Sequence, residues 1–160
     1  MQKDIPIYNV INTRYHRGQS ILEVILALAI LSIIITAIVS LTSTSVNTST
    51  YSKNVSQANR YADEVVEYIR KEKEFSGWSD FTSDIITAYG GIWCMPDLTF
   101  TINEACDPLN NSHFISSTIF QRMLTATPIN DNSIDIDVEV VWTDDKGLHQ
   151  TKSSTTVSNW

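Results

Sequence analysis

Hydrophobic residues are distributed unevenly along the chain, and their densest run lies near the N-terminus. From Val24 to Leu41, eighteen consecutive residues carry no charge, and twelve of them are Ile, Leu or Val. As a helix this run would reach about 27 Å, close to the thickness of the hydrocarbon core of a bilayer. The gain from twelve aliphatic side chains outweighs the cost of Glu23 beside them, which is at most about 3 kcal/mol. The run therefore predicts a transmembrane helix.

A second helical pattern follows the apolar run. Neither Gly nor Pro occurs between Gly18 and Gly77, so one continuous helix is allowed. Its weak point is the stretch 42–50, composed of Ser, Thr, Asn and Val, where helix propensity falls by roughly 4 to 5 kcal/mol relative to Ala. Beyond this stretch, apolar residues recur at steps of three and four, which predicts an amphipathic helix ending at Gly77. The residues of its apolar face are Tyr51, Val55, Ala58, Ala62, Val65 and Ile69.

The period of the pattern changes after Gly77. Aromatic and loop residues between Trp78 and Trp93 lead into four segments with β character, which are Leu98–Ile102, Phe114–Met123, Ile134–Trp142 and Thr151–Val157. The third alternates apolar and acidic residues most clearly, and Asp144 to Gly147 follows it as a predicted hairpin turn. We expect an antiparallel sheet with one solvated face, whose apolar face the amphipathic helix covers.

These patterns predict an α+β fold, in which a long N-terminal helix packs on a small C-terminal antiparallel sheet. The expected parts are a leader (1–18), a transmembrane helix half (19–41), an exported amphipathic half (42–76) and a globular β domain (77–160). All positive charge flanking the apolar run precedes it, so the N-terminus should stay cytoplasmic and the rest of the chain should be exported.

Net charge and the two cysteines bear on partners and environment. The formal charge is −7, and removing residues 1–18 (three basic residues against one acidic, +2) leaves −9. An acidic chain lacks the broad basic surface that binds nucleic acid, so nucleic acid is disfavoured as a partner.

Cys94 and Cys106 are the only cysteines, and both lie on the exported side. A disulfide between them is plausible there, and two unpaired thiols are the alternative.

A short motif precedes the apolar run. It resembles the prepilin (class III) signal of type IV pilins and type II secretion pseudopilins, and reads Arg17-Gly18-Gln19-Ser20-Ile21-Leu22-Glu23. The resemblance implies that a prepilin peptidase cleaves between Gly18 and Gln19 and methylates the new amine of Gln19. It also implies a pilin-like fold, other pilin-like subunits and an inner-membrane assembly platform as partners, and membrane lipid around the helix. Two departures from the family are Gln19, where Phe is usual, and the absence of Pro between residues 19 and 76.

Glu23 would be the fifth residue of the cleaved chain, which is the acidic position of that family. Burying an isolated carboxylate in lipid or in a filament core is costly, so such a group is retained mainly where it meets a compensating charge. Cleavage would create one, the amine of Gln19, and the amine of a neighbouring subunit could pair with Glu23.

Other interpretations of the N-terminal region remain open. An ordinary secretory signal would be cut after the apolar run, within Ser40–Ser45, and an uncleaved anchor would begin at Met1. The first function hypothesis is a structural subunit, not an enzyme, that starts as a single-pass cell-membrane protein and enters an extracellular or periplasmic filament. The leader and Gln19 favour a minor pilin or pseudopilin. The sequence does not distinguish whether the filament serves adhesion, competence or secretion. The alternative is a monomeric membrane-tethered binding domain that has no need of Glu23.

Catalytic and metal sites have little support in the sequence. The Asp residues between 131 and 145 fit no EF-hand spacing and suit the wet face of a strand, so we expect no metal. No motif for a nucleotide or another cofactor occurs, and a nucleophile pair of Cys94 and His113 explains the cysteine less well than a disulfide. Ser32, Thr36 and Ser40 form a slightly polar stripe, which suits either helix contact or hydroxyls bonded to the backbone.

Overall fold

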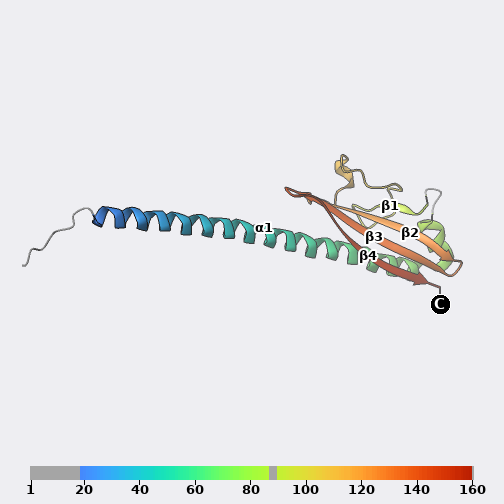
Figure 1. The fold of residues 1–160 in the computed structure, drawn as a ribbon. Coiled ribbons are helices and arrows are strands. Elements are labelled where there is room, and N and C mark those ends of the chain that lie inside the picture. The colour runs from blue at the N-terminus through green and yellow to red at the C-terminus, as the bar shows by residue number, and fades with distance from the viewer. Residues whose placement is uncertain (1–18, 87–89, 160) are drawn as a thin grey trace, which may run out of the picture. The chain divides into compact units, whose positions relative to one another are not determined.

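The computed structural model describes residues 19–86 and 90–159, with side chains from residue 21 onward. The chain divides into two compact units, one up to Thr48 and one from Ser49. The longest element is α1 (Gln19–Ser76), a helix of 58 residues that contributes to both units (Figure 1). It runs without interruption through the stretch 42–50. There the hydroxyls of Thr42, Thr44 and Thr48 donate to carbonyls four residues earlier, at 2.9 to 3.1 Å.

α1 ends where the sequence predicts. Gly77 has a φ of +78°, which favours glycine, and its N–H donates to the Lys73 carbonyl at 3.1 Å. The chain then enters a second short helix, α2 (Trp78–Ile85), where the sequence predicted loop residues. Phe81 and Ile85 are buried one helical turn apart, so packing against the core stabilises α2.

Four antiparallel strands follow in the order β1-β2-β3-β4 (Figure 1). Their bounds are β1 (Ile92–Cys94), β2 (Phe120–Asn130), β3 (Ser133–Asp144) and β4 (Gly147–Ser158). A long N-terminal helix followed by a small antiparallel sheet confirms the predicted α+β, pilin-like layout.

Two predicted strands are correct, one is correct in its last four residues, and one is wrong. Ile134–Trp142 lies within β3 and Thr151–Val157 lies within β4. Leu98–Ile102 is irregular, and only Ile102 forms a single bridge, with Cys94. Phe114–Met123 enters β2 only from Phe120, because a 3-10 turn (η1, Asn111–His113) and a tight turn at Ser117 (φ +60°) precede the strand.

The core of the second unit lies between α1 and one face of the sheet. Ala58, Ala62, Val65 and Ile69 of the predicted apolar face are buried, whereas Tyr51 at its start is 42% exposed. From the sheet they meet alternate residues of β3, namely Ile134, Ile136, Val138, Val140 and Trp142, all of which are buried. Intervening Asp135 and Asp137 are exposed, so the alternating pattern assigned the two faces of β3 correctly.

The predicted hairpin turn joins β3 to β4. Asp144 pairs with Gly147 across a turn formed by Asp145 and Lys146, and Gly147 has a φ of +117°. The carboxylate of Asp144 accepts the N–H of Lys146 at 2.8 Å and contacts Nε2 of His149 at 2.8 Å. These bonds hold the turn and lower the pKa of Asp144, with the His149 bond as the largest cause.

Candidate functional site

The candidate processing site lies at the start of α1. The helix begins at Gln19, and the predicted cleavage bond joins this residue to Gly18, which lies outside the described residues. Cleavage at this bond and methylation of the Gln19 amine therefore stay predictions. If the chain is cleaved after Gly18, the new N-terminal amine would lie on the first residue of α1.

None of the described residues covers the apolar half of α1. Fourteen Ile, Leu and Val side chains between Ile21 and Leu41 are 48 to 71% exposed. Consecutive positions such as Ile33, Ile34 and Ile35 are among them, so apolar surface occurs on all sides of the helix. At about 1.5 to 3 kcal/mol for each side chain, exposure of this surface to water would cost at least on the order of 20 kcal/mol. Length and composition suit this helix to cross a membrane, a test that a signal sequence or a buried core helix also passes. The surface requires lipid or other protein around it.

Glu23 lies at the head of this apolar segment and is exposed. Among the residues that the structure describes, Glu23 contacts no cation. Within one helix, Gln19 and Glu23 are one turn apart, about 6 Å along the axis. The pairing of Glu23 with an amine thus remains a prediction about assembled chains.

Two hydroxyls of the stripe, those of Ser32 and Thr36, bond to the backbone of the same helix. Ser32 donates to the Leu28 carbonyl at 2.8 Å, and Thr36 donates to the Ser32 carbonyl at 2.8 Å. These bonds satisfy both hydroxyls without a partner helix.

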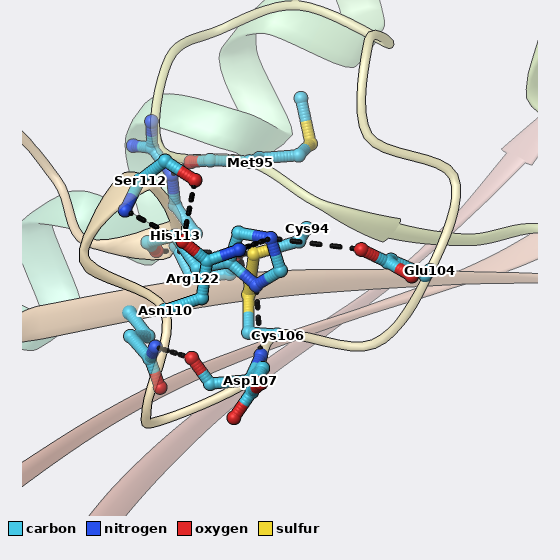
Figure 2. The surroundings of a disulfide bond; sticks show 10 residues. Cys94, Met95, Glu104, Cys106, Asp107, Asn110, Ser112, His113 and Arg122 are labelled. Atoms are coloured by element: carbon cyan, nitrogen blue, oxygen red, sulfur yellow. Dashed lines mark hydrogen bonds and ion pairs between the residues drawn. A yellow bond between two sulfur atoms is a disulfide. The ribbon is translucent and has the colours of Figure 1, made fainter.

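A disulfide holds the loop that follows β1. Cys94 and Cys106 are joined with an S–S distance of 2.04 Å, and Cys94 is fully buried. Figure 2 shows the loop residues gathered around this bond, with His113 among them. Because its sulfur is in the disulfide, Cys94 is not a free nucleophile, which rules out the alternative of a Cys94–His113 catalytic pair in this state.

Buried His113 fastens the same loop. Its Nδ1 accepts the N–H of Asp107 at 2.8 Å, and its Nε2 lies 3.1 Å from Nδ2 of Asn110 and 3.6 Å from a Glu104 carboxylate oxygen. Gln121 of β2 donates to the carbonyl of Asp107 at 2.7 Å, so the loop is also tied to the sheet. The loop is therefore held by a covalent bond and by a set of hydrogen bonds.

Arg122, which was not among the residues predicted from the sequence, links three parts of the second unit. Its side chain is 3% exposed, donates through Nε to the Met95 carbonyl at 3.0 Å and through Nη1 to the Tyr61 carbonyl at 3.1 Å. Glu64 lies 3.4 Å from Nη1. Burial lowers the pKa of Arg122, and the charge of Glu64 opposes that shift. The signal in the sequence is a single basic residue within a row of otherwise apolar alternate positions, which are Phe120, Leu124 and Ala126.

The described residues show no arrangement for a metal ion, since no group of three His, Cys, Asp or Glu side chains gathers among them. Asp135 accepts the hydroxyl of Thr156 at 2.6 Å, and Asp137 accepts the hydroxyl of Ser154. These carboxylates lie on the wet face of β3. A groove of about 790 Å³ opens beside the disulfide loop, and it has both polar and apolar walls.

Residues 13–39 match the family model of the prokaryotic N-terminal methylation motif. This motif is the class III signal of type IV pilins and pseudopilins, so the resemblance found in the sequence is confirmed. The match contains the predicted cleavage bond at Gly18 and Gln19, the acidic residue Glu23 and most of the apolar run. No curated protein and no solved structure matches the chain.

Proposed function

Because the chain carries the prokaryotic N-terminal methylation motif, we propose that it is a structural subunit of a type IV pilus-like filament or a type II secretion-like pseudopilus. The observation that carries the proposal is the continuity between this motif, at residues 13–39, and a helix whose apolar side chains are exposed on every side. A prepilin peptidase would remove residues 1–18 and methylate Gln19. The subunit would be a minor pilin or a pseudopilin.

Each part of the chain then has a place in assembly. The helix half 19–41 anchors the subunit in the cell membrane, with the positive charges of the leader on the cytoplasmic side. In the filament the same half exchanges lipid for the helices of other pilin-like subunits, which keeps its apolar surface out of water. The amphipathic half, 42–76, and the domain from residue 77 onward remain outside. An inner-membrane assembly platform would move the subunit between the two environments.

Glu23 sets the axial register between adjacent subunits of the filament. Its carboxylate would leave the membrane interface for the filament core, where an unpaired charge is strongly unfavourable. The amine of Gln19 of an adjacent subunit, displaced along the filament axis, supplies the opposite charge. Pairing these two groups favours one axial displacement over its neighbours.

The test compares Glu23→Ala with Glu23→Asp in the native host. Both variants should be cleaved after Gly18, because the peptidase acts before assembly, and intact-mass measurement of the membrane-extracted protein reads this step. Glu23→Ala should be depleted at least about tenfold from sheared filaments, whereas Glu23→Asp, which keeps the charge, should retain part of the wild-type level. Normal filament entry of Glu23→Ala would refute the role of the carboxylate.

A further inference from the structure

The two edges of the sheet differ in whether their backbone groups have partners. In an antiparallel ladder, alternate residues of a strand bond to one neighbour and the residues between them point the other way. Asp144 pairs with Gly147 at the turn, and at the far end the N–H of Asn159 donates to the Asn132 carbonyl at 2.8 Å. Odd-numbered residues of β4 therefore bond to β3, and its even-numbered residues direct N–H and C=O outward.

The edge at β1 is closed by the chain itself. The same alternation turns Ile92 and Cys94 outward there. The Cys94 N–H donates to the Ile102 carbonyl at 3.0 Å, and the Ile92 carbonyl accepts from Asn103 Nδ2 at 2.9 Å. The disulfide loop thus occupies this edge and leaves no room for another strand.

The edge at β4 is open over most of its twelve residues. Among the described residues, one outward group of β4 has a hydrogen-bond partner, the Ser158 carbonyl, which accepts from Lys73 Nζ. The outward N–H and C=O groups belong to exposed residues with no proline among them, namely Leu148, Gln150, Lys152, Ser154 and Thr156. Proteins usually block such an edge by shortening, bending or covering it, because it is a template for another extended segment.

The surroundings of this edge indicate the chemistry of a partner. On the outer face, Asp135 and Asp137 lie one strand inside the edge and accept hydroxyls of β4. Neither carboxylate forms an ion pair among the described residues, and the nearby Lys152 pairs with Glu139 at 3.4 Å. From Ser49 onward the chain has sixteen acidic and eight basic residues, a formal charge of −8. A segment with lysine or arginine side chains on the outer face would be attracted to these carboxylates.

The other side of the edge meets a shallow depression on α1. Its volume is about 540 Å³, and its lining includes Tyr51, Val55 and Asn59. Tyr51 packs edge-on against His149, and Asn59 accepts the hydroxyl of Thr151 at 2.6 Å, so the depression borders β4. Every second side chain of an added strand would point toward it, and small apolar side chains suit the end near Tyr51 and Val55.

We infer that the free edge of β4 receives an extended segment of another exported polypeptide. The segment adds a fifth strand over Leu148–Thr156, with basic side chains toward Asp135 and Asp137 and small apolar ones toward α1. A second copy is disfavoured as the occupant. The chain from Ser49 onward has a formal charge of −8, so two copies repel each other, whereas a basic segment is attracted. That the partner is an exported polypeptide rests on the proposed membrane anchorage.

Hydrogen exchange on the full chain in neutral detergent micelles tests the inference. Before any addition, the amides of Gln150, Lys152 and Ser154 should exchange fast and those of Thr151 and Ser153 slowly. The probe is a nine-residue peptide of alternating lysine and valine with blocked ends. Saturating peptide should slow the three fast amides at least about tenfold, since each gains a hydrogen bond.

Control peptides separate strand addition from simple charge attraction. Methylating the backbone nitrogens that face β4 keeps the charge but removes the donors, and it should weaken binding at least about tenfold. Asp137→Asn should weaken the unmodified peptide more at low salt than at high salt. Ser154→Pro should abolish the protection, because proline has no N–H to donate to the added strand. The variant should still fold, because an edge strand tolerates proline where the N–H points outward. Ser154→Ala should keep the protection.

Several results would overturn the inference: no binding, equal binding of the methylated peptide, protection away from β4, or β4-dependent self-association of the chain without peptide. The last result would make a second copy the occupant. Because peptide binding does not depend on cleavage after Gly18, its failure would leave the filament proposal standing. A wrong N-terminus would in turn leave the binding result unaffected.

Discussion

Gly90 and Gly91 have almost the same backbone conformation, with φ of +75° and +72°, but only Gly90 has room for a side chain. A Cβ added at Gly91 would lie 2.5 Å from the Ala126 carbonyl oxygen, whereas no atom of the residues that the structure describes lies within 4 Å of one added at Gly90. The pair Gly91→Ala and Gly90→Ala therefore isolates the close approach of the chain before β1 to β2.

The expected magnitudes follow from this geometry. Both variants bear the cost of a left-handed conformation, about 1 to 2 kcal/mol for an L-residue. Gly91→Ala must also move a backbone carbonyl of β2, at about 1 to 3 kcal/mol. That movement strains the bond from the Ala126 N–H to the Gly91 carbonyl, now 2.8 Å, which is worth about 0.5 to 1.5 kcal/mol. Gly91→Ala should thus lower the free energy of unfolding by about 1.5 to 4.5 kcal/mol more than Gly90→Ala.

Urea unfolding of the full chain in detergent micelles, followed by tryptophan fluorescence, measures the difference. Trp93 and Trp142 are 5% and 2% exposed, so their emission should report the loss of the core. The transition slopes of the two variants should be equal, so that a change of midpoint reports stability. Equal destabilisation by both variants would show that the contact between Gly91 and Ala126 is not as close as the structure places it.

Three further predictions concern residues of the second unit. Arg122→Met should lower the free energy of unfolding by about 2 to 5 kcal/mol, because buried carbonyls lose their donor, and an effect below about 0.5 kcal/mol in the same urea assay would contradict this role. Replacing Cys94 and Cys106 together by Ser should cost about 3 kcal/mol, and reduction of the wild type should have a similar effect; unchanged stability would contradict a structural bond. The pKa of Asp144 is lowered in the folded chain, so its stabilising effect should be complete above about pH 4 and lost as the pH falls further. Asp144→Asn should remove that part of the acid sensitivity when unfolding is followed as the pH is lowered, and an unchanged acid transition would refute this role of the carboxylate.

Local periodicity was sufficient for the elements whose burial follows a regular pattern. The steps of three and four after Tyr51 and the alternation from Ile134 gave the buried faces of α1 and β3 correctly, because each element packs one continuous face on the core. The length of the apolar run and the lack of charge within it likewise identified the half of α1 whose apolar side chains are exposed. The motif at 17–23 identified the family of the signal, since it depends on local sequence alone.

The elements that were not predicted from the sequence depend on contacts between residues far apart in the chain. β1 has three residues, and its pairing of Ile92 with Thr125 and of Cys94 with Met123 has no local signal. Leu98–Ile102 looks like a strand, yet the disulfide holds it in a loop that closes the sheet edge. The role of Arg122 depends on carbonyls that a helix and a loop far apart in the sequence bring to it. The partner of Glu23 belongs to another chain on this account, so one sequence cannot supply it.

The N-terminal residue of the protein from its native host tests the central claim most directly. Sequencing or mass analysis of membrane-extracted material should find chains that begin at Gln19, with a methyl group on the amine where the peptidase has acted fully. A chain that begins at Met1, or at a residue within 40–45, would contradict the proposal that cleavage frees a charged amine beside the apolar helix.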